Sequence, residues 1–497
     1  MMFISGQMRF PNLAEKLYSK DVFNPATGEL VGTVFLADEK TVFDAISSSA
    51  LAFESWSKKS AQERGLILLQ ISTALKSEKQ KEELAVLLTK EQGKPLFESR
   101  REIEGVTEVI DYFAGLYSSF HSDFYENTNG YAFTIKQPLG VCAAILPWNL
   151  PALIFSWKVI PALLCGNAVV VKPSTTCPLT VLKLAEIFYE LGLPSGVLNV
   201  IPANGELAAG VFAKSPQICK ISFTGSIDAG KSVRRQIADG LGVSNSLGDS
   251  GGSIGSAGKR LTLELGGSDA MIICDDVNIQ TCAAEAVRAR FFNCGQACVS
   301  PKRIFVFESI FDDFKDQVLR EVSKIKVGNG LDKNTTLGPI CDKTQWESIL
   351  SILRFVPQES VLAGGKVPQL TGNLKGGFFI EPTVVSDISN DSVLLTEEIF
   401  GPIMVLVPVK DLDEAVLRAN DTKFGLGASV WTNDLKRVQK AVQELKAGVV
   451  WVNQHSRVLP SLPFGGVKES GLGRENGYRV LEDYLETKTV VIKNTML

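Results

Sequence analysis

Histidine is scarce in this chain of 497 residues, which has only His121 and His455. A Cys-His pair or a Ser-His-Asp triad would have to use one of these two residues, because each arrangement needs an imidazole as its base. His455 is the more plausible base, although a place in a pocket wall or on the surface is the commoner fate of such a residue. We therefore expect the chemistry to rely on other groups.

An excess of basic residues is also absent. The net charge of −4 gives no positive field that would attract nucleic acid or an anionic membrane. Nine cysteines, odd in number and scattered, favour a reducing compartment. Residues 1–7 (MMFISGQ) lack the basic and apolar regions of a secretory signal. We therefore expect a cytoplasmic protein without a nucleic-acid partner.

No long apolar run is free of helix breakers. The most apolar region, Pro138 to Val171, carries one charge, Lys158, but also four prolines. Prolines interrupt a continuous helix, so this region predicts buried strands and a short helix, not a bilayer span. We expect no membrane association.

The apolar pattern of the chain predicts an α/β fold with two doubly wound, mostly parallel sheets. After a mixed amino-terminal region, apolar strands and amphipathic helices alternate from Pro138, and a second such series follows Leu261. Two segments, Tyr131 to Gln137 and Thr487 to Lys493, alternate apolar and polar residues as exposed strands do. The predicted domains are 1–118 with 138–264, then 265–460, and the exposed strands lie in 119–137 and 479–497.

Residues 240–258 (GLGVSNSLGDSGGSIGSAG) are mainly glycine and serine. This composition cannot bury enough apolar surface to fold, so it predicts a flexible surface loop.

A cysteine-containing loop stands between a helical pattern, Thr281 to Phe292, and a strand pattern, Arg303 to Phe307. Rigid elements on both sides favour a reactive side chain, here Cys298. The alternative is that Cys294 and Cys298 are ordinary buried thiols. A metal pair is disfavoured because no further Cys or His lies nearby, and we expect no metal.

Residues 293–298 (NCGQAC) resemble the nucleophile loop of the aldehyde dehydrogenase superfamily. The resemblance extends over roughly residues 20 to 493 and implies that Cys298 attacks an aldehyde. Asn149 would donate to the resulting oxyanion, and Glu264 would activate the water that hydrolyses a thioester. Lys158 and Glu475 match positions that carry the proton onward, although a simple salt bridge between them is equally compatible.

The same resemblance implies a dinucleotide site for NAD or NADP, with a Rossmann-like cofactor domain and a catalytic domain. Lys172 would bind the adenosine ribose, and Thr175 stands where many NAD-preferring members have a Glu, so NADP is not excluded. The residues implied at this site are Pro147, Trp148, Lys172, Ser174, Thr175, Gly225, Ser226, Glu398 and Phe400.

A rival interpretation comes from residues 225–232 (GSIDAGKS), which satisfy the P-loop pattern of nucleotide triphosphatases. Residues 271–275 (MIICD) mimic the metal-holding strand of such enzymes. Five matches with separate chemical roles favour the dehydrogenase.

The family resemblance also implies a substrate pocket and subunit-joining strands. The pocket walls would include Leu153, Trp157, Ala297, His455 and Arg457. This mainly apolar set favours a broad aliphatic or aromatic aldehyde, and Arg457 leaves succinate semialdehyde as the second candidate. We expect a homodimer or a homotetramer.

Overall fold

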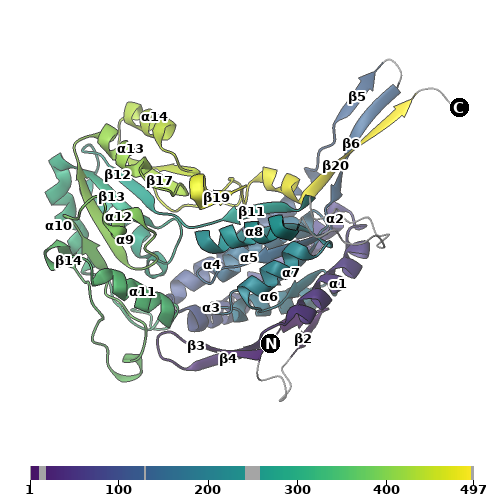
Figure 1. Ribbon diagram of the computed structural model, residues 1–497, viewed down its shortest axis with the longest axis horizontal. Helices are drawn as coiled ribbons and strands as arrows, with labels where there is room; N and C mark the ends of the chain where they lie inside the picture. Colours follow the sequence, from purple (N-terminus) through teal and green to yellow (C-terminus); the bar gives the residue numbers. More distant parts are fainter. Residues whose placement is uncertain (1, 10–17, 128–129, 241–257, 494–497) are drawn as a thin grey trace.

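The computed structural model describes residues 2–9, 18–127, 130–240 and 258–493. They form two lobes, each built on one sheet, and a three-stranded arm projects from the larger lobe (Figure 1). The glycine- and serine-rich segment 240–258 falls almost entirely outside these residues, so its predicted conformation is not tested.

The larger lobe contains an eight-stranded sheet whose five central strands are parallel. Its order is β19 (Gly471–Leu472), β11 (Arg260–Glu264), β10 (Ile218–Thr224), β7 (Val141–Ile145), β8 (Ala168–Lys172), β9 (Leu198–Val200), β1 (Met2–Ile4) and β2 (Gln7–Arg9).

Both faces of this sheet are covered by helices. Alternate residues of β7 point to opposite sides. Val141 and Ala143 join the core under α1 (Glu39–Trp56), α7 (Gly205–Lys214) and α8 (Ile227–Gly240). Cys142 and Ala144 join the core under the other helices. These are α2 (Ala61–Leu75), α3 (Glu78–Gln92), α4 (Leu96–Gly115), α5 (Pro151–Leu164) and α6 (Leu179–Glu190).

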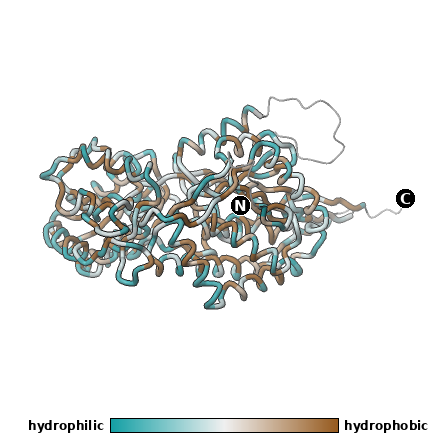
Figure 2. Tube along the Cα trace, turned by 90° about the horizontal axis from the view of Figure 1, so that it is seen from below, coloured by the Kyte–Doolittle hydropathy of each residue, from teal (hydrophilic) through white to brown (hydrophobic). Residues whose placement is uncertain are grey.

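The smaller lobe contains a seven-stranded sheet in which only β14 is antiparallel. Its order is β14 (Val361–Ala363), β15 (Thr383–Val385), β16 (Ile403–Val409), β13 (Pro301–Phe307), β12 (Asp269–Ile273), β17 (Gly427–Trp431) and β18 (Val449–Val452). Its helices are α9 (Ile279–Phe291), α10 (Phe311–Val322), α11 (Lys343–Leu353), α12 (Val393–Thr396), α13 (Leu412–Asn420) and α14 (Leu435–Glu444). In Figure 2 hydrophobic stretches of the chain run through the interior of both lobes, and hydrophilic stretches lie along their outer edges.

These two sheets confirm the predicted α/β fold with mostly parallel strands. The domain limits given above stay a prediction. The apolar region Pro138 to Val171 becomes β7, α5 and β8, as its prolines indicated. Within the described ranges, no helix combines the length and the apolar character that a membrane span needs.

The arm consists of β5 (Phe124–Asn127), β6 (Gly130–Pro138) and β20 (Leu485–Lys493), paired antiparallel. The two exposed strands predicted from the alternating pattern are β6 and β20, and both are longer than expected. A separate hairpin, β3 (Ser19–Phe23) with β4 (Leu30–Phe35), lies beside the larger lobe.

Candidate active site

The loop that carries Cys298 has an unusual backbone. After α9 ends at Phe291, the residues Asn293, Cys294 and Gly295 have φ values of 50°, 57° and 72°. A non-glycine residue pays roughly 1–2 kcal/mol for this left-handed conformation. A Cβ atom on Gly295 would also lie 2.3 Å from the carbonyl oxygen of Gly401. The turn therefore depends on Gly295.

Arg290, at the end of α9, holds this loop in place through hydrogen bonds of its side chain. Its guanidinium is fully buried and donates hydrogen bonds to the carbonyl oxygens of Ile403 (2.6 Å) and Gly401 and to Ser300 Oγ (2.7 Å). The loop is thus tied to the start of β16 and to the segment before β13. Sequence analysis missed Arg290, because only the folded chain brings these acceptors together.

Cys298 is the reactive thiol best placed to meet a substrate. It is partly exposed, whereas the other eight cysteines, including Cys294, are buried. Burial, Asp269 and Glu398 raise the pKa of the Cys298 thiol to about 12. The thiol is therefore protonated at neutral pH, and an attack by its sulfur requires a base.

Asn149 follows β7 and lies against the Cys298 loop. Its side-chain Nδ2 donates to the carbonyl oxygen of Gln296 at 3.0 Å. Its own carbonyl oxygen accepts from Lys94 Nζ at 2.7 Å, and Lys94 forms a buried ion pair with Glu102 at 2.6 Å. Glu102 also accepts from the backbone N–H groups of Ala152 and Leu153. This network holds Asn149 beside the loop.

A second carboxylate of α4 supports the loop directly. Glu98 accepts from the backbone N–H of Asn293 at 3.0 Å, and Asn293 Nδ2 donates to the carbonyl oxygen of Asn149 at 2.9 Å. Sequence analysis missed Glu98, Glu102 and Lys94. Glu98 and Glu102 lie four residues apart on a mainly apolar helix face, and this spacing could have indicated two buried carboxylates from the sequence.

Glu264 ends β11, and its carboxyl group faces Gly465. A Cβ atom on Gly465 would lie 2.6 Å from Glu264 Oε1. Neither carboxyl oxygen has a hydrogen-bond partner among the described residues. Burial and the neighbouring Glu475 raise the pKa of Glu264 well above its usual range, and Glu264 in turn helps to raise the pKa of Cys298. The carboxyl group therefore acts electrostatically on the thiol.

Lys158 and Glu475 form a buried ion pair at 2.6 Å, and Ser222 Oγ donates to the same carboxylate oxygen at 2.6 Å. The structure therefore contains the Lys158–Glu475 salt bridge, which was one of the two roles considered from the sequence. A part in proton transfer stays a prediction.

The predicted nicotinamide end of the site lies where the larger lobe passes into the smaller. Glu398 accepts from the backbone N–H of Gly267 at 3.0 Å, and a Cβ atom on Gly266 would lie 2.2 Å from Glu398 Oε2. The two glycines therefore allow the carboxylate to sit on the backbone. Trp148 and Phe400 meet edge to face, with ring centroids 5.4 Å apart.

The predicted adenosine end lies at the carboxyl ends of β8 and β10. Lys172 ends β8 and is 8% exposed, and Thr175 Oγ1 accepts from Lys20 Nζ at 3.0 Å. Ser174 Oγ accepts from the backbone N–H of Thr176. Gly225 and Ser226 lead into the first turn of α8. Strand ends, a helix N-terminus and a buried cation fit a dinucleotide.

The P-loop interpretation is wrong. Helix α8 begins at Ile227, so Gly230 and Lys231 lie inside the helix, and the loop that would surround a triphosphate does not form. Lys231 pairs with Glu469 at 3.1 Å, and a Cβ atom on Gly230 would meet Leu265 at 2.5 Å. Gly230 therefore allows α8 to pack closely against Leu265.

A cavity of about 300 Å³ lies along residues 449–464. Its lining is mainly apolar: Val449, Val450, Trp451, Gln454, Arg457, Val458, Leu459, Leu462, Pro463 and Phe464. Trp157 packs on Phe464 with ring centroids 5.2 Å apart. Cys298, Leu153 and Val458 all pack against the apolar cluster that contains these rings. Trp451 in the cavity wall packs on His455, which is bonded to the carbonyl oxygen of Val299, so the wall is linked to the residue after Cys298.

Of the five predicted wall residues only Arg457 lines this cavity, and Leu153, Trp157, Ala297 and His455 lie outside its lining. The His455 ring does not line the cavity: it is buried on Trp451 and bonded to Ser429 Oγ (2.7 Å) and the Val299 carbonyl oxygen (2.9 Å). Burial lowers its pKa to about 3, so it is neutral and supports the residue after Cys298. Ala297 is 3% exposed and also lies outside the lining.

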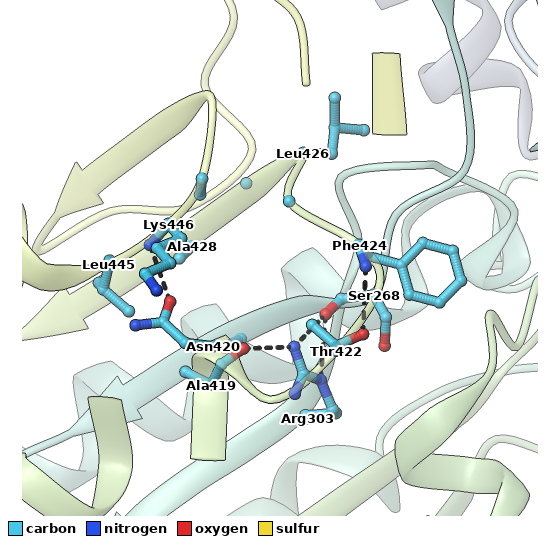
Figure 3. A pocket seen from close by; sticks show the side chains of 14 residues that line it. Ser268, Arg303, Ala419, Asn420, Thr422, Phe424, Leu426, Ala428, Leu445 and Lys446 are labelled. Carbon is cyan, nitrogen blue, oxygen red and sulfur yellow. Dashed lines mark hydrogen bonds between the residues drawn. The ribbon is translucent and has the colours of Figure 1, made fainter. Parts of the chain in front are cut away.

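Figure 3 shows a second, much smaller cavity in the smaller lobe. Arg303 donates there to the carbonyl oxygens of Ser268 and Ala419. Its volume of about 10 Å³ suits no more than a water molecule, so it is not a substrate site.

Together these features define an α/β protein with a partly exposed thiol and a crevice suited to a dinucleotide. Residues 14–490 match the model of the aldehyde dehydrogenase family. The chain is 36% identical over 480 residues to 4-trimethylaminobutyraldehyde dehydrogenase of Sus scrofa, which covers 96% of this chain and 93% of that protein.

Solved structures agree with this match. The chain superposes on an NADP-dependent enzyme of E. coli with a TM-score of 0.91 and 33% identity, covering 99% and 98% of the two chains. It superposes equally well on betaine aldehyde dehydrogenase of Staphylococcus aureus in complex with NAD+, at 32% identity and with 100% and 95% coverage.

The chain belongs to the aldehyde dehydrogenase family. It is accordingly an enzyme that depends on NAD or NADP, as the sequence motifs predicted.

The raised pKa of Glu264 makes a prediction about stability. A carboxyl group whose pKa is higher in the folded state contributes stability below its unfolded pKa, near 4.5, and this stability is lost as pH rises toward the folded pKa. Glu264→Gln removes the titration. We therefore expect the free energy of unfolding of the variant to increase relative to that of wild type from about pH 5 to about pH 8.5, by at most ~1.4 kcal/mol per pH unit. Denaturant unfolding at several pH values measures this difference.

Glu206→Gln, which removes an exposed carboxyl group on α7, controls for the loss of one charge. A difference between Glu264→Gln and wild type that stays constant with pH would contradict the assignment.

Proposed function

We propose that this chain oxidises uncharged aldehydes to carboxylates, with Cys298 as the nucleophile. The observation that carries the proposal is the meeting of three distant segments. Cys298 is the one partly exposed thiol, Asn149 is hydrogen-bonded to its loop, and Glu264 lies close enough to influence its pKa.

In this proposal Glu264 removes the thiol proton while the sulfur of Cys298 bonds to the carbonyl carbon. A carboxylate with a raised pKa suits this task, because it is a stronger base than an exposed one. The carbonyl oxygen gains negative charge and accepts a hydrogen bond from Asn149 Nδ2, a donor typically worth about 2.7–4 kcal/mol in the barrier.

When bound, the nicotinamide ring supplies the hydride acceptor, and Glu398 and Phe400 are the residues that would hold it. A thioester then joins the acyl group to Cys298. Glu264 would first pass the thiol proton to the Glu475 carboxylate, which is paired with Lys158. The free Glu264 carboxylate would then take a proton from water, the oxygen of which bonds to the acyl carbon, and the sulfur of Cys298 leaves as a thiolate.

Two thiols four residues apart provide a direct test. Cys298→Ala should abolish aldehyde-dependent formation of reduced cofactor, because no other cysteine is partly exposed. Cys294→Ala should keep most of the activity, since this side chain is 2% exposed. Initial rates by absorbance of the reduced cofactor, together with melting temperatures, check both variants. Loss of activity in a well-folded Cys294→Ala with a retained rate in Cys298→Ala would show that the wrong sulfur was chosen.

The lining of the cavity along residues 449–464 supports an uncharged substrate. Its walls are aliphatic and aromatic, and its only charged lining residue is Arg457. A cation near the substrate disfavours a trimethylammonium aldehyde such as the one named for the relatives of Sus scrofa and Homo sapiens. Arg457 leaves a semialdehyde, with its distal carboxylate, as the second candidate.

An aldehyde panel tests this order. We expect kcat/KM to fall from hexanal and benzaldehyde to succinate semialdehyde, and to be lowest for 4-trimethylaminobutyraldehyde. Arg457→Gln should raise KM for succinate semialdehyde about tenfold and leave hexanal unaffected, because only the semialdehyde carries a carboxylate. Highest kcat/KM with the trimethylammonium substrate would refute the proposal.

We also propose that the arm joins subunits into a homo-oligomer. The edge strands β20 and β5 expose Val491, Phe124 and Tyr125, at 72%, 66% and 54%. An exposed apolar strand edge pairs readily with another chain.

Light scattering after size exclusion should give a multiple of 53.9 kDa for wild type and a shift toward the monomer for Val491→Lys. Leu417→Lys, an exposed site on α13, should not change the mass. A wild-type monomer would refute the oligomer.

A further inference from the structure

Two buried cysteines meet where the lobes touch. Cys177 precedes α6 of the larger lobe, and Cys341 precedes α11 of the smaller lobe. Their sulfur atoms lie 3.4 Å apart and share a hydrogen bond, although 164 residues separate them in the chain. Within the described residues, no other two cysteines are hydrogen-bonded to each other. The pair therefore bridges the two lobes.

The main chains of the two lobes are in close contact around this pair. The backbone N–H of Leu96 donates to the carbonyl oxygen of Gly330 at 2.9 Å. A Cβ atom on Gly93 would lie 2.6 Å from Pro339 Cγ, and Gly338 has no room for a Cβ atom beside the carbonyl oxygen of Gly93. The same contact between the lobes keeps the two sulfur atoms at short range.

Cys177 is held by α3. Its Sγ donates to the carbonyl oxygen of Glu91 at 3.5 Å, and the Glu91 carboxylate accepts from the backbone N–H groups of Leu179 (2.7 Å) and Thr180 (2.8 Å). A disulfide bond is about 2.05 Å long, so the two sulfur atoms would have to approach by roughly 1.4 Å. Because the main chain around Cys177 is fixed, this approach displaces mainly Cys341.

Cys341 is connected to the active-site loop. Its backbone N–H donates to Gln296 Oε1 at 2.9 Å, and the carbonyl oxygen of Gln296 accepts from Asn149 Nδ2. Gln296 lies two residues before Cys298. A displacement of Cys341 would therefore reach the loop that carries the reactive thiol.

We propose that a peroxide oxidises Cys341 and Cys177 to a disulfide, which joins the two lobes and slows turnover. Cys341 is 4% exposed and Cys177 is 0% exposed, so the oxidant meets Cys341 first. Disulfides in reducing compartments are usually transient and often sense the redox state, which is the behaviour proposed for this pair.

The reaction has two balanced steps. The sulfur of Cys341 attacks hydrogen peroxide, an S–O bond forms as the O–O bond breaks, and the products are a sulfenic acid and water. The sulfur of Cys177 then attacks the sulfenic sulfur, and hydroxide leaves with the Cys177 proton as a second water. The two thiols together lose two electrons, which the peroxide gains. Burial raises the pKa of the Cys177 thiol well above its usual range, which slows the second step.

Peptide mapping of the full-length wild type tests whether the bond forms. The reduced protein is treated with hydrogen peroxide, its free thiols are blocked with iodoacetamide, and it is digested without reductant. Mass spectrometry should find the peptides of Cys177 and Cys341 joined, and dithiothreitol should separate them. Cys282→Ser is the matched control, because Cys282 is also a 4%-exposed cysteine of the smaller lobe, and in this variant the joined peptides should still form.

The melting temperature tests the link between the lobes without catalysis. A bond that closes a segment of 164 residues should raise the melting temperature by roughly 4 °C, because it restricts the unfolded chain. The comparison of oxidised with reduced protein uses Cys298→Ala, so that oxidation of the partly exposed thiol does not contribute. An unchanged melting temperature in protein with joined peptides would refute the restraint of the lobes.

Turnover of an aldehyde is measured before oxidation, after it, and after dithiothreitol. The reversible fall in kcat should be at least about threefold larger in wild type than in Cys177→Ser or Cys341→Ser, because a displacement on the order of 1 Å can cost up to about a hundredfold in rate. Oxidation of Cys298 affects all three proteins alike and does not contribute to this difference. Melting temperatures check that both variants fold.

Other results would overturn the inference. These are recovery of Cys341 only as a blocked free thiol, its bonding to a cysteine other than Cys177, and an equal reversible fall in kcat in wild type and both serine variants. Only the turnover measurement rests on the proposed function. A reduced wild type that oxidises no aldehyde would refute that function, and the peptide map and melting temperature would still decide whether the lobes are joined.

Discussion

The arrangement of the active site depends on buried charge that is satisfied mainly by the backbone. Arg290 forms no ion pair among the described residues and instead donates to the carbonyl oxygens of Gly401 and Ile403. Lys94 and Glu102 divide their hydrogen bonds between each other and the main chain around Asn149. Such groups are costly to bury and costlier to leave unpaired, so each fixes the segments that it touches.

The same burial sets the electrostatics of the site. Glu264, Glu398 and Asp269 are carboxylates in a region with little solvent, and all three have raised pKa values. They raise the pKa of Cys298 in turn, which keeps the thiol from being charged before a substrate arrives. Reactivity therefore depends on a base whose own proton affinity is high. One environment thus suppresses the free thiolate and supplies the base that forms it.

Local patterns predicted most of the fold, because its central strands are short runs of apolar residues between turns. The helical pattern Thr281 to Phe292 corresponds to α9 (Ile279–Phe291), and the strand pattern Arg303 to Phe307 corresponds to β13 (Pro301–Phe307). Strand β1 was missed, since three residues, Met2–Ile4, show no periodicity. The motif residues Asn149, Glu264 and Cys298 stay predictions from the sequence; in the structure Asn149 is hydrogen-bonded to the Cys298 loop, and Glu264 acts electrostatically on the thiol.

Contacts between residues far apart in the chain could not be predicted from local sequence patterns. Lys94 meets Asn149 across 55 residues, and Arg290 meets Gly401 across 111. His455 was expected in a pocket wall, but its neighbours Asn453 and Ser456 have φ values of 52° and 60°, in a turn that accompanies an inward-facing ring. The glycine and lysine spacing of residues 225–232 fitted a P-loop, although helix α8 starts too early for one. In each case backbone conformation, which the sequence pattern does not report, decided the outcome.

The two places where the chain crosses between lobes are also where the site is built. The first crossing, 265–268, follows Glu264 and carries the glycines under Glu398. The second, 453–470, supplies most of the cavity wall and returns to the larger lobe as β19 beside β11. Because Gly465 in this return segment lies against Glu264, the cavity and the base are positioned by the same contact. A change in the relative position of the lobes would therefore move substrate, base and cofactor residues together, so the rigidity of these crossings governs the geometry of the chemistry.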